Sequence, residues 1–189
     1  MDSVYTHDRL IRPLVLESLA GASWLREECH LGSPGRIDVS ALVEGELVGL
    51  EIKAANDSLS RLLPPKGFQV DQFSAVYDRV TLVCAEKHLG KALAAIPSWW
   101  GVSVPRDGTL EPERPSERNP APASRRLAGV LWVAEAREVA RSLGIARGAR
   151  SKWALVDVLA AAPEEALREA LARYLPAREW RSPTKQIRL

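Results

Sequence analysis

The chain has only two cysteines and no long apolar run, and both features limit the cellular compartments in which we expect to find it. Cys29 and Cys84 lie far apart without CxxC spacing, so we expect two structural thiols in a reducing compartment. No stretch is long enough to cross a bilayer, and the first residues lack the basic and apolar regions of a signal peptide. These absences predict a cytoplasmic protein with no membrane partner.

Strong net charge and common metal or nucleotide motifs are also missing. The formal net charge of +2 is too small to indicate nucleic-acid binding by itself, so that argument depends on local clusters. The three histidines show no metal-ligand spacing, and there is no GxxxxGK(S/T) segment. The sequence therefore predicts neither a zinc site nor a nucleotide-driven motor.

What the chain does contain is a run of alternating apolar and polar residues from position 36 to position 53. The alternation is interrupted at Glu44-Gly45 and then resumes, which is the pattern of two strands joined by a short turn. With a two-residue loop at this point, Val43 pairs with Glu46. We therefore expect a β-hairpin.

Counting outward from that pair places Asp38 opposite Glu51 and Arg36 opposite Lys53. Opposed side chains have Cβ atoms roughly 4.5–5.5 Å apart, and like charges placed there repel. A divalent cation removes the repulsion, and Mg²⁺ is held by one or two carboxylates with water and phosphate oxygens. Asp38 and Glu51 are therefore a candidate metal site, with a cluster of surface ion pairs as the alternative.

Asp38, followed on the next strand by the segment Glu51–Lys53, resembles the signature of the PD-(D/E)XK phosphodiesterases, whose fold is that of many restriction enzymes and repair nucleases. Three segments resemble a small bacterial and phage branch of this superfamily, namely residues 35–38, 49–53 and 77–83. The resemblance covers most of residues 8–105. It implies that Asp38, Glu51 and the backbone carbonyl of Ile52 bind Mg²⁺ or Mn²⁺. It also implies that Lys53 holds the attacking water and stabilises charge that develops on phosphorus.

The same resemblance implies further residues near the metal. The superfamily often supplies another acidic ligand from its first helix, and Glu17 is the acid best placed for this role. Related nucleases often carry a QxxxY motif on the helix after the lysine strand, where this chain has Gln69 and Phe73. Gln69 is thus a candidate contact to metal or DNA, whereas Phe73 lacks the hydroxyl and is expected in the core. The alternatives are Glu27 or Glu28 for the acid and Gln72 for the glutamine.

Periodicity along the rest of the first part predicts helices and strands in a mixed order. Helices are expected over residues 6–20, 68–79 and 87–96, and further strands over 24–31, 80–84 and 99–104. Pro13 is expected to start or bend the first helix. This order indicates an α/β fold in which helices flank a mixed central sheet, as in the nuclease superfamily.

The composition changes after residue 105. Residues 106–126 contain four prolines among charged and small residues, which predicts an exposed linker. Helices are then expected over 127–143, over 152–162 and from 163, with Gly144 and Ser151 as caps. The 189 residues would thus form a nuclease-like core (1–105), a Pro-rich linker (106–126) and a helical module (127–189).

Residues 139–156 resemble a SAP-type helix–loop–helix, which is a small DNA-binding hairpin. The resemblance implies phosphate contacts from Arg147, Arg150 and Lys152, aided by the N–H groups of the second helix. The alternative is a helical lid on the core. Arg36 is a further candidate for DNA binding, paired with either a phosphate or an acidic side chain.

These features predict a metal-dependent nuclease that acts on DNA. The rival hypothesis is a catalytically inactive DNA-binding or adaptor protein that keeps the fold, which the small net charge and the missing tyrosine at Phe73 favour. The sequence leaves open the choice of single- or double-stranded DNA, RNA as a substrate, and endo- or exonuclease action. It also leaves open a role in DNA repair, restriction or phage defence. Double-strand cutting would favour a symmetric homodimer.

Overall fold

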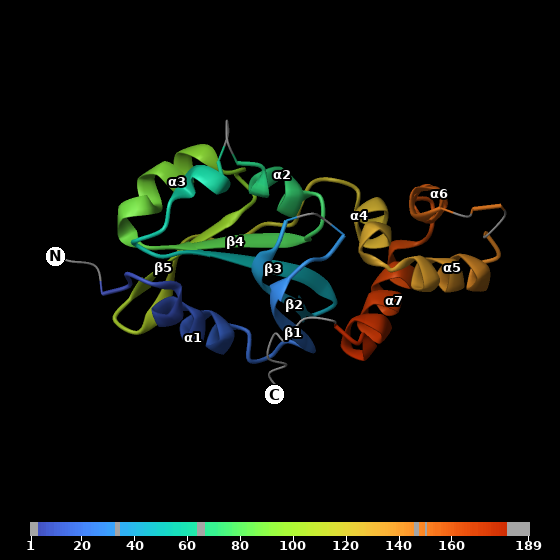
Figure 1. Ribbon diagram of the computed structural model, residues 1–189, viewed down its shortest axis with the longest axis horizontal. Coiled ribbons are helices and arrows are strands. Elements are labelled where there is room, and N and C mark those ends of the chain that lie inside the picture. Colours follow the sequence, from blue (N-terminus) through green and yellow to red (C-terminus); the bar gives the residue numbers. More distant parts are fainter. Residues whose placement is uncertain (1–3, 33–34, 64–66, 146–147, 150, 181–189) are drawn as a thin grey trace.

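A six-stranded mixed sheet forms the centre of the protein, with helices on both faces and at one end (Figure 1). The computed structural model describes residues 4–32, 35–63, 67–145, 148–149 and 151–180. The strands are β1 (Trp24–Cys29), β2 (Ile37–Val43), β3 (Glu46–Lys53), β4 (Arg79–Cys84), β5 (Gly101–Arg106) and β6 (Thr109–Arg114). The helices are α1 (Asp8–Ser18), α2 (Gln69–Ser74), α3 (Leu89–Ala95), α4 (Ala123–Val130), α5 (Val133–Ser142), α6 (Lys152–Leu159) and α7 (Glu164–Ala177), with 3-10 turns η1 (Leu59–Arg61) and η2 (Glu86–His88). Within these ranges no helix is long and apolar enough to span a membrane.

The strands lie in the sheet in the order in which they occur in the sequence. β1, β2 and β3 pair antiparallel, β3, β4 and β5 pair parallel, and β6 returns antiparallel to β5. Parallel neighbours need a crossover connection, and the segments that contain α2 and α3 supply the two crossovers. The expected α/β fold with a mixed sheet is therefore confirmed.

The hairpin of β2 and β3 has the predicted turn and register. Glu44 and Gly45 have φ angles of 50° and 78°, as the two central residues of a type I′ turn require. Val43 pairs with Glu46, as counted from the sequence. Because register depends on the turn, this geometry determines which residues face each other at the far end of the hairpin.

The two faces of the sheet are covered by different helices (Figure 1). α1 buries Ile11 and Val15 completely, in one cluster with Val39 of β2. The helix begins well before Pro13 and passes through it. On the other face, Phe73 of α2 is buried in a larger cluster, as expected for a core residue.

The segment 106–126 differs from the expected linker, because it begins with a sixth strand. Asp107 and Gly108 form a tight turn with φ angles of 46° and 80°, and β6 then pairs with β5. Pro112 is tolerated because β6 is an edge strand, where a missing N–H leaves no neighbour unpaired. Proline content was therefore a misleading guide to structure here.

The single helix expected over residues 127–143 is instead two helices, α4 and α5. The Glu135 carboxylate accepts a hydrogen bond of 2.7 Å from the backbone N–H of Trp132, which closes the first turn of α5 and separates it from α4. The expected caps are confirmed. Gly144 follows α5 with a φ angle of 70°. The Ser151 hydroxyl accepts a hydrogen bond from the backbone N–H of Ala154 in the first turn of α6.

The C-terminal helices share a hydrophobic core with the sheet. Tyr77 and Val102 from the sheet region belong to the same buried cluster as Leu127 of α4 and Leu171 of α7. Figure 1 shows α4–α7 grouped at one end of the sheet. Packing is thus continuous from the core expected at residues 1–105 into the helices that follow.

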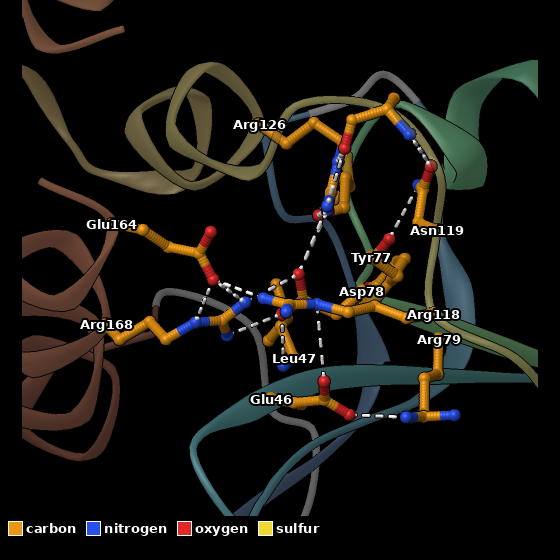
Figure 2. A network of polar contacts seen from close by, with 12 residues as sticks. Glu46, Leu47, Tyr77, Asp78, Arg79, Arg118, Asn119, Arg126, Glu164 and Arg168 are labelled. Atoms are coloured by element: carbon orange, nitrogen blue, oxygen red, sulfur yellow. Dashed lines mark hydrogen bonds and ion pairs between the residues drawn. The ribbon is translucent and has the colours of Figure 1, made fainter. Parts of the chain in front are cut away.

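A buried polar network also joins these helices to the sheet (Figure 2). The fully buried carboxylate of Asp78 binds Arg126 of α4 at 3.2 Å and Arg168 of α7 at 2.8 Å. It also accepts a 2.8 Å hydrogen bond from the N–H of Leu47. Burial by itself would raise the pKa of Asp78, but the hydrogen bonds and positive charges outweigh burial and hold this pKa below its ordinary value.

Candidate active site

Asp38, Glu51 and Lys53 come together at the end of the hairpin away from its turn. Pairing between β2 and β3 extends to Val39 and Leu50, and one more residue along each strand gives Asp38 and Glu51. β4 ends beside Lys53, because the two strands run parallel with Lys53 next to Cys84. The site therefore lies where strands end, as ligand sites in α/β sheets commonly do.

Glu51 is the most buried acid of this group, with 2% of its surface exposed. Its Oε1 lies 2.5 Å from Nζ of Lys53, whereas its Oε2 has no hydrogen-bond partner among the described residues. Burial, and then the charge of Asp38, raise the pKa of Glu51 to about 7. The carboxylate is thus held in an environment that disfavours its negative charge.

Asp38 is placed by the backbone of the partner strand. Its Oδ2 accepts a 2.7 Å hydrogen bond from the N–H of Ile52, and its Oδ1 lies 3.3 Å from Arg12. Burial raises the pKa of Asp38 above its ordinary value, although the Ile52 N–H and the charges of Arg12 and Lys53 oppose the rise. Asp38 and Glu51 are therefore electrostatically linked, with Lys53 close to both.

Arg12 of α1 binds the acids around the site, and the sequence did not single it out. Its guanidinium contacts Asp8, lies 2.8 Å from Glu28 and lies 3.2 Å from Glu27, in addition to its contact with Asp38. The i,i+4 spacing of Asp8 and Arg12 is the one signal that could have indicated this cluster. The convergence of acids from α1, β1 and β2 is a tertiary feature.

Glu28 reaches this cluster because the backbone of β1 is irregular at that residue. It has a positive φ of 52°, while the β1–β2 register is unchanged on either side of it, from Glu27–Val39 to Cys29–Ile37, which places Glu28 opposite Asp38. Glu28 also pairs with Arg36 at 2.8 Å. Arg36 lies just before β2 and is thus paired with an acidic side chain, one of the two partners expected for it.

Glu17 does not reach the site. It is exposed near the C-terminal end of α1, whereas Asp8 and Arg12 occupy the turns that face the acids. At 1.5 Å per residue, Glu17 lies about 13 Å further along the helix axis than Asp8. The expectation that α1 supplies Glu17 is thus corrected in favour of Asp8, with Glu28 as a second nearby acid.

A cavity of about 320 Å³ opens beside these residues. Asp38, Ile52 and Lys53 line it from the sheet, and Ser58, Ser60 and Arg61 line it from the segment that contains η1. This segment is held in place by Asp57, which accepts a 2.8 Å hydrogen bond from the N–H of Ala54, and by the buried Leu59. The cavity therefore combines carboxylates with two cations and two hydroxyls, a set that can take a phosphate group.

Gln69 also belongs to this region, as expected. It is the first residue of α2, and its side chain is close enough to Glu51 to lower the pKa of that residue, after the larger effects of burial and neighbouring charges. Its Oε1 is buried without a hydrogen-bond partner in the described ranges. Gln72 instead lies against Gly35.

The donor set fits a divalent cation. Oxygens of Asp8, Glu28 and Asp38 lie within 4.8 Å of one another, and Glu51, on the strand paired with that of Asp38, has a buried oxygen without a hydrogen-bond partner among the described residues. Mg²⁺ and similar hard cations take carboxylate oxygens of this kind. Asp38 and Glu51 would hold the ion, and Arg12 supplies positive charge to the remaining acids.

The expected phosphate contacts in the C-terminal helices are only partly described. Lys152 does not point freely to the surface, because its Nζ donates to the carbonyl of Leu131 at the end of α4. Burial lowers the pKa of Lys152. Arg147 and Arg150 lie outside the described residues, so their proposed role in DNA binding stays a prediction.

The chain belongs to the bacteriophage P4 protein cII family, whose model matches residues 10–185. No curated protein matches it. Among solved structures, it is similar to SPO1766, a protein of unknown function from Silicibacter pomeroyi. The two share 19% identity with a TM-score of 0.43, over 78% of this chain and 94% of that one, and a likeness of this degree carries no argument about function.

Proposed function

We propose that the protein is a metal-dependent nuclease that hydrolyses phosphodiester bonds in DNA, with Mg²⁺ or Mn²⁺ as cofactor. Glu51 is the observation that carries the proposal, because one oxygen of this buried carboxylate binds Lys53 and the other has no partner among the described residues. A divalent cation at the second oxygen would add to the charge of Lys53 and reduce the cost of burying Glu51 beside Asp38. The resemblance of Asp38 and Glu51–Lys53 to the PD-(D/E)XK signature supports the choice of reaction.

The chain's own groups have distinct roles in this proposal. When bound, the ion would polarise the phosphate and lower the pKa of a water molecule. Asp38 and Glu51 would hold it, and Nζ of Lys53 would orient the attacking water and stabilise negative charge on the phosphate oxygens. Arg61 and the hydroxyls of the η1 segment would hold the substrate phosphate in the 320 Å³ cavity.

A cleavage assay tests the proposal. Labelled single- and double-stranded DNA would be incubated with Mg²⁺ or Mn²⁺ and with wild type, Asp38→Asn or Lys53→Met. We expect wild type to cut and both variants to lose at least about 100-fold in rate. Glu111→Gln, which changes an exposed acid on β6, should cut normally. Equal cutting by all four proteins would indicate a contaminating nuclease, and no cutting under any condition would refute the proposal.

One observation favours a second candidate, which is a DNA-binding adaptor without catalysis. The guanidinium of Arg12 already contacts four carboxylates, namely Asp8, Glu27, Glu28 and Asp38, and so supplies much of the positive charge that an ion would bring. An adaptor should bind DNA equally well in EDTA and with Asp38→Asn. A nuclease should show a higher Tm with Mg²⁺ or Mn²⁺, because ligands that bind only the folded state stabilise it.

A further inference from the structure

A larger cavity lies apart from the acids, where the C-terminal helices meet the segment after β1. It has a volume of about 450 Å³. His30 lines it from the β1 side, the α4–α5 junction contributes Trp132, and the start of α6 contributes Lys152 and Trp153. No part of the proposed reaction uses these residues.

Two tryptophans at this cavity are unusually exposed. Trp153 shows 71% of its surface and Trp132 shows 47%. The Trp132 indole is held in place by Arg178, 4.8 Å from the ring centre, and by the edge-on ring of Trp180 at 6.1 Å. Trp132 thus offers a fixed aromatic surface, and Trp153 offers one that is open to solvent.

The polar groups of the cavity are donors and cations. Lys152 donates to the carbonyl of Leu131, and Arg178, which also lines the cavity, is paired with Glu135 at 2.6 Å. None of the described residues that line the cavity is acidic. The lining therefore suits a ligand that is aromatic and negatively charged. It is poorly suited to a basic peptide, which would need acidic side chains as partners.

We propose that this cavity binds an unpaired nucleobase of single-stranded DNA, which stacks on Trp153 and Trp132. The inference rests on the proposed function for its choice of DNA as the ligand. Bases stack on aromatic side chains whatever their identity, whereas bases in a duplex are covered by their neighbours. Specificity for single strands, rather than for a base sequence, follows from this arrangement.

The position of the cavity supports a strand that also reaches the acids. Glu28 of β1 contacts Arg12 in the candidate active site, and His30, only two residues further along, lines this cavity. One single strand could therefore follow the segment after β1 from one site to the other. The cavity would then anchor the substrate while a neighbouring phosphodiester lies near Asp38.

Binding of a fluorescein-labelled oligothymidine, followed by anisotropy in EDTA to prevent cleavage, tests this inference. Trp153→Ala should raise the Kd roughly fivefold to 100-fold through lost stacking, whereas Trp153→Phe should keep most of the affinity. Leu93→Ala, which trims an exposed apolar side chain of α3, is the matched control and should bind as wild type does. An abasic strand of equal length should bind wild type as weakly as oligothymidine binds Trp153→Ala.

Unchanged affinity of Trp153→Ala, or equal binding of the abasic strand, would overturn the inference. So would a Trp153→Ala variant that loses self-association in sedimentation velocity but keeps its affinity for oligothymidine, since the surface would then join two copies of the chain. Cleavage distinguishes this failure from failure of the proposed function. A protein that binds through Trp153 yet never cuts would refute only the nuclease, and one that cuts with Trp153→Ala binding unchanged would refute only the cavity.

Discussion

At the scale of single residues, the environment of Glu51 disfavours its charged form. Glu51 is buried, its pKa is raised to about 7, and one of its oxygens has no partner in the described part of the chain. Folding alone does not explain a carboxylate in this position. Groups that are poor for stability and well placed for chemistry are typical of functional sites.

Replacing this acid by its amide should separate stability from function. Glu51→Gln removes the buried charge and its repulsion from Asp38, while the amide oxygen can still accept from Lys53. We expect the metal-free variant to be more stable by about 1–2 kcal/mol in urea unfolding, and to lose both cleavage and any rise of Tm with Mg²⁺. A less stable variant would show that the pair with Lys53 is structural.

Replacing either of two glycines by alanine should change the stability of the protein, in opposite directions for the two positions. A Cβ on Gly49 would lie 2.6 Å from Ile37 and 2.9 Å from the ring of Tyr77, so Gly49→Ala should cost about 1–3 kcal/mol of stability. A Cβ on Gly90, in helix α3, would meet nothing within 4 Å, and Gly90→Ala should add about 0.5–1 kcal/mol. Chemical unfolding of both variants checks the pair, and equal effects would contradict it.

At the scale of elements, the Asp78 network decides how α4 and α7 sit on the sheet. One carboxylate neutralises arginines from both helices and accepts a hydrogen bond from the N–H of Leu47 near the start of β3 (Figure 2). Asn119 extends the network by donating 2.7 Å and 2.9 Å hydrogen bonds to the carbonyls of Ser74 and Tyr77. Because the network is buried, its members depend on one another.

Asp78→Asn should therefore be strongly destabilising. It leaves Arg126 and Arg168 buried without their main counter-charge, which costs about 3–5 kcal/mol in comparable cases. Asp157→Asn is the matched control, because its 2.8 Å pair with Arg125 is exposed on both sides and should contribute less than about 1 kcal/mol. Similar losses for the two variants in urea unfolding would show that burial of the pair is unimportant.

The same carboxylate should make stability depend on pH in the acid range. The pKa of Asp78 is lower in the folded protein than in the unfolded chain, where it is near 3.9. Its stabilisation is thus fully present above about pH 4 and is lost as the pH falls through the folded-state pKa. The advantage of wild type over Asp78→Asn should shrink with acidification, and a constant difference in unfolding free energy down to pH 2 would contradict the assignment.

At the scale of the whole molecule, the sheet and the C-terminal helices share one hydrophobic cluster. Tyr77 and Leu171, far apart in sequence, share the same buried cluster. A fragment that ends at residue 122 would expose that cluster to water, and we expect it to lack a cooperative thermal transition by circular dichroism. The full chain should unfold in one transition. A folded fragment would show that the nuclease-like core and the helical module are independent domains.

Sequence patterns were sufficient to predict the structure wherever it depends on residues that are close together in the chain. Alternation and the Glu44-Gly45 turn determined the hairpin and its register, and with them the meeting of Asp38 and Glu51, because a period of two and a two-residue turn leave a single pairing. The caps at Gly144 and Ser151 were predictable for the same reason.

Other features depended on how separate elements pack. The sequence by itself determined that acids and a lysine meet at the end of the hairpin. Only the tertiary structure decided that α1 presents Asp8 and Arg12 there instead of Glu17, since this depends on how the helix lies across the sheet. It likewise decided that residues after 106 pair as β6 and that Lys152 turns inward to Leu131, because both outcomes require partners that are distant in the chain.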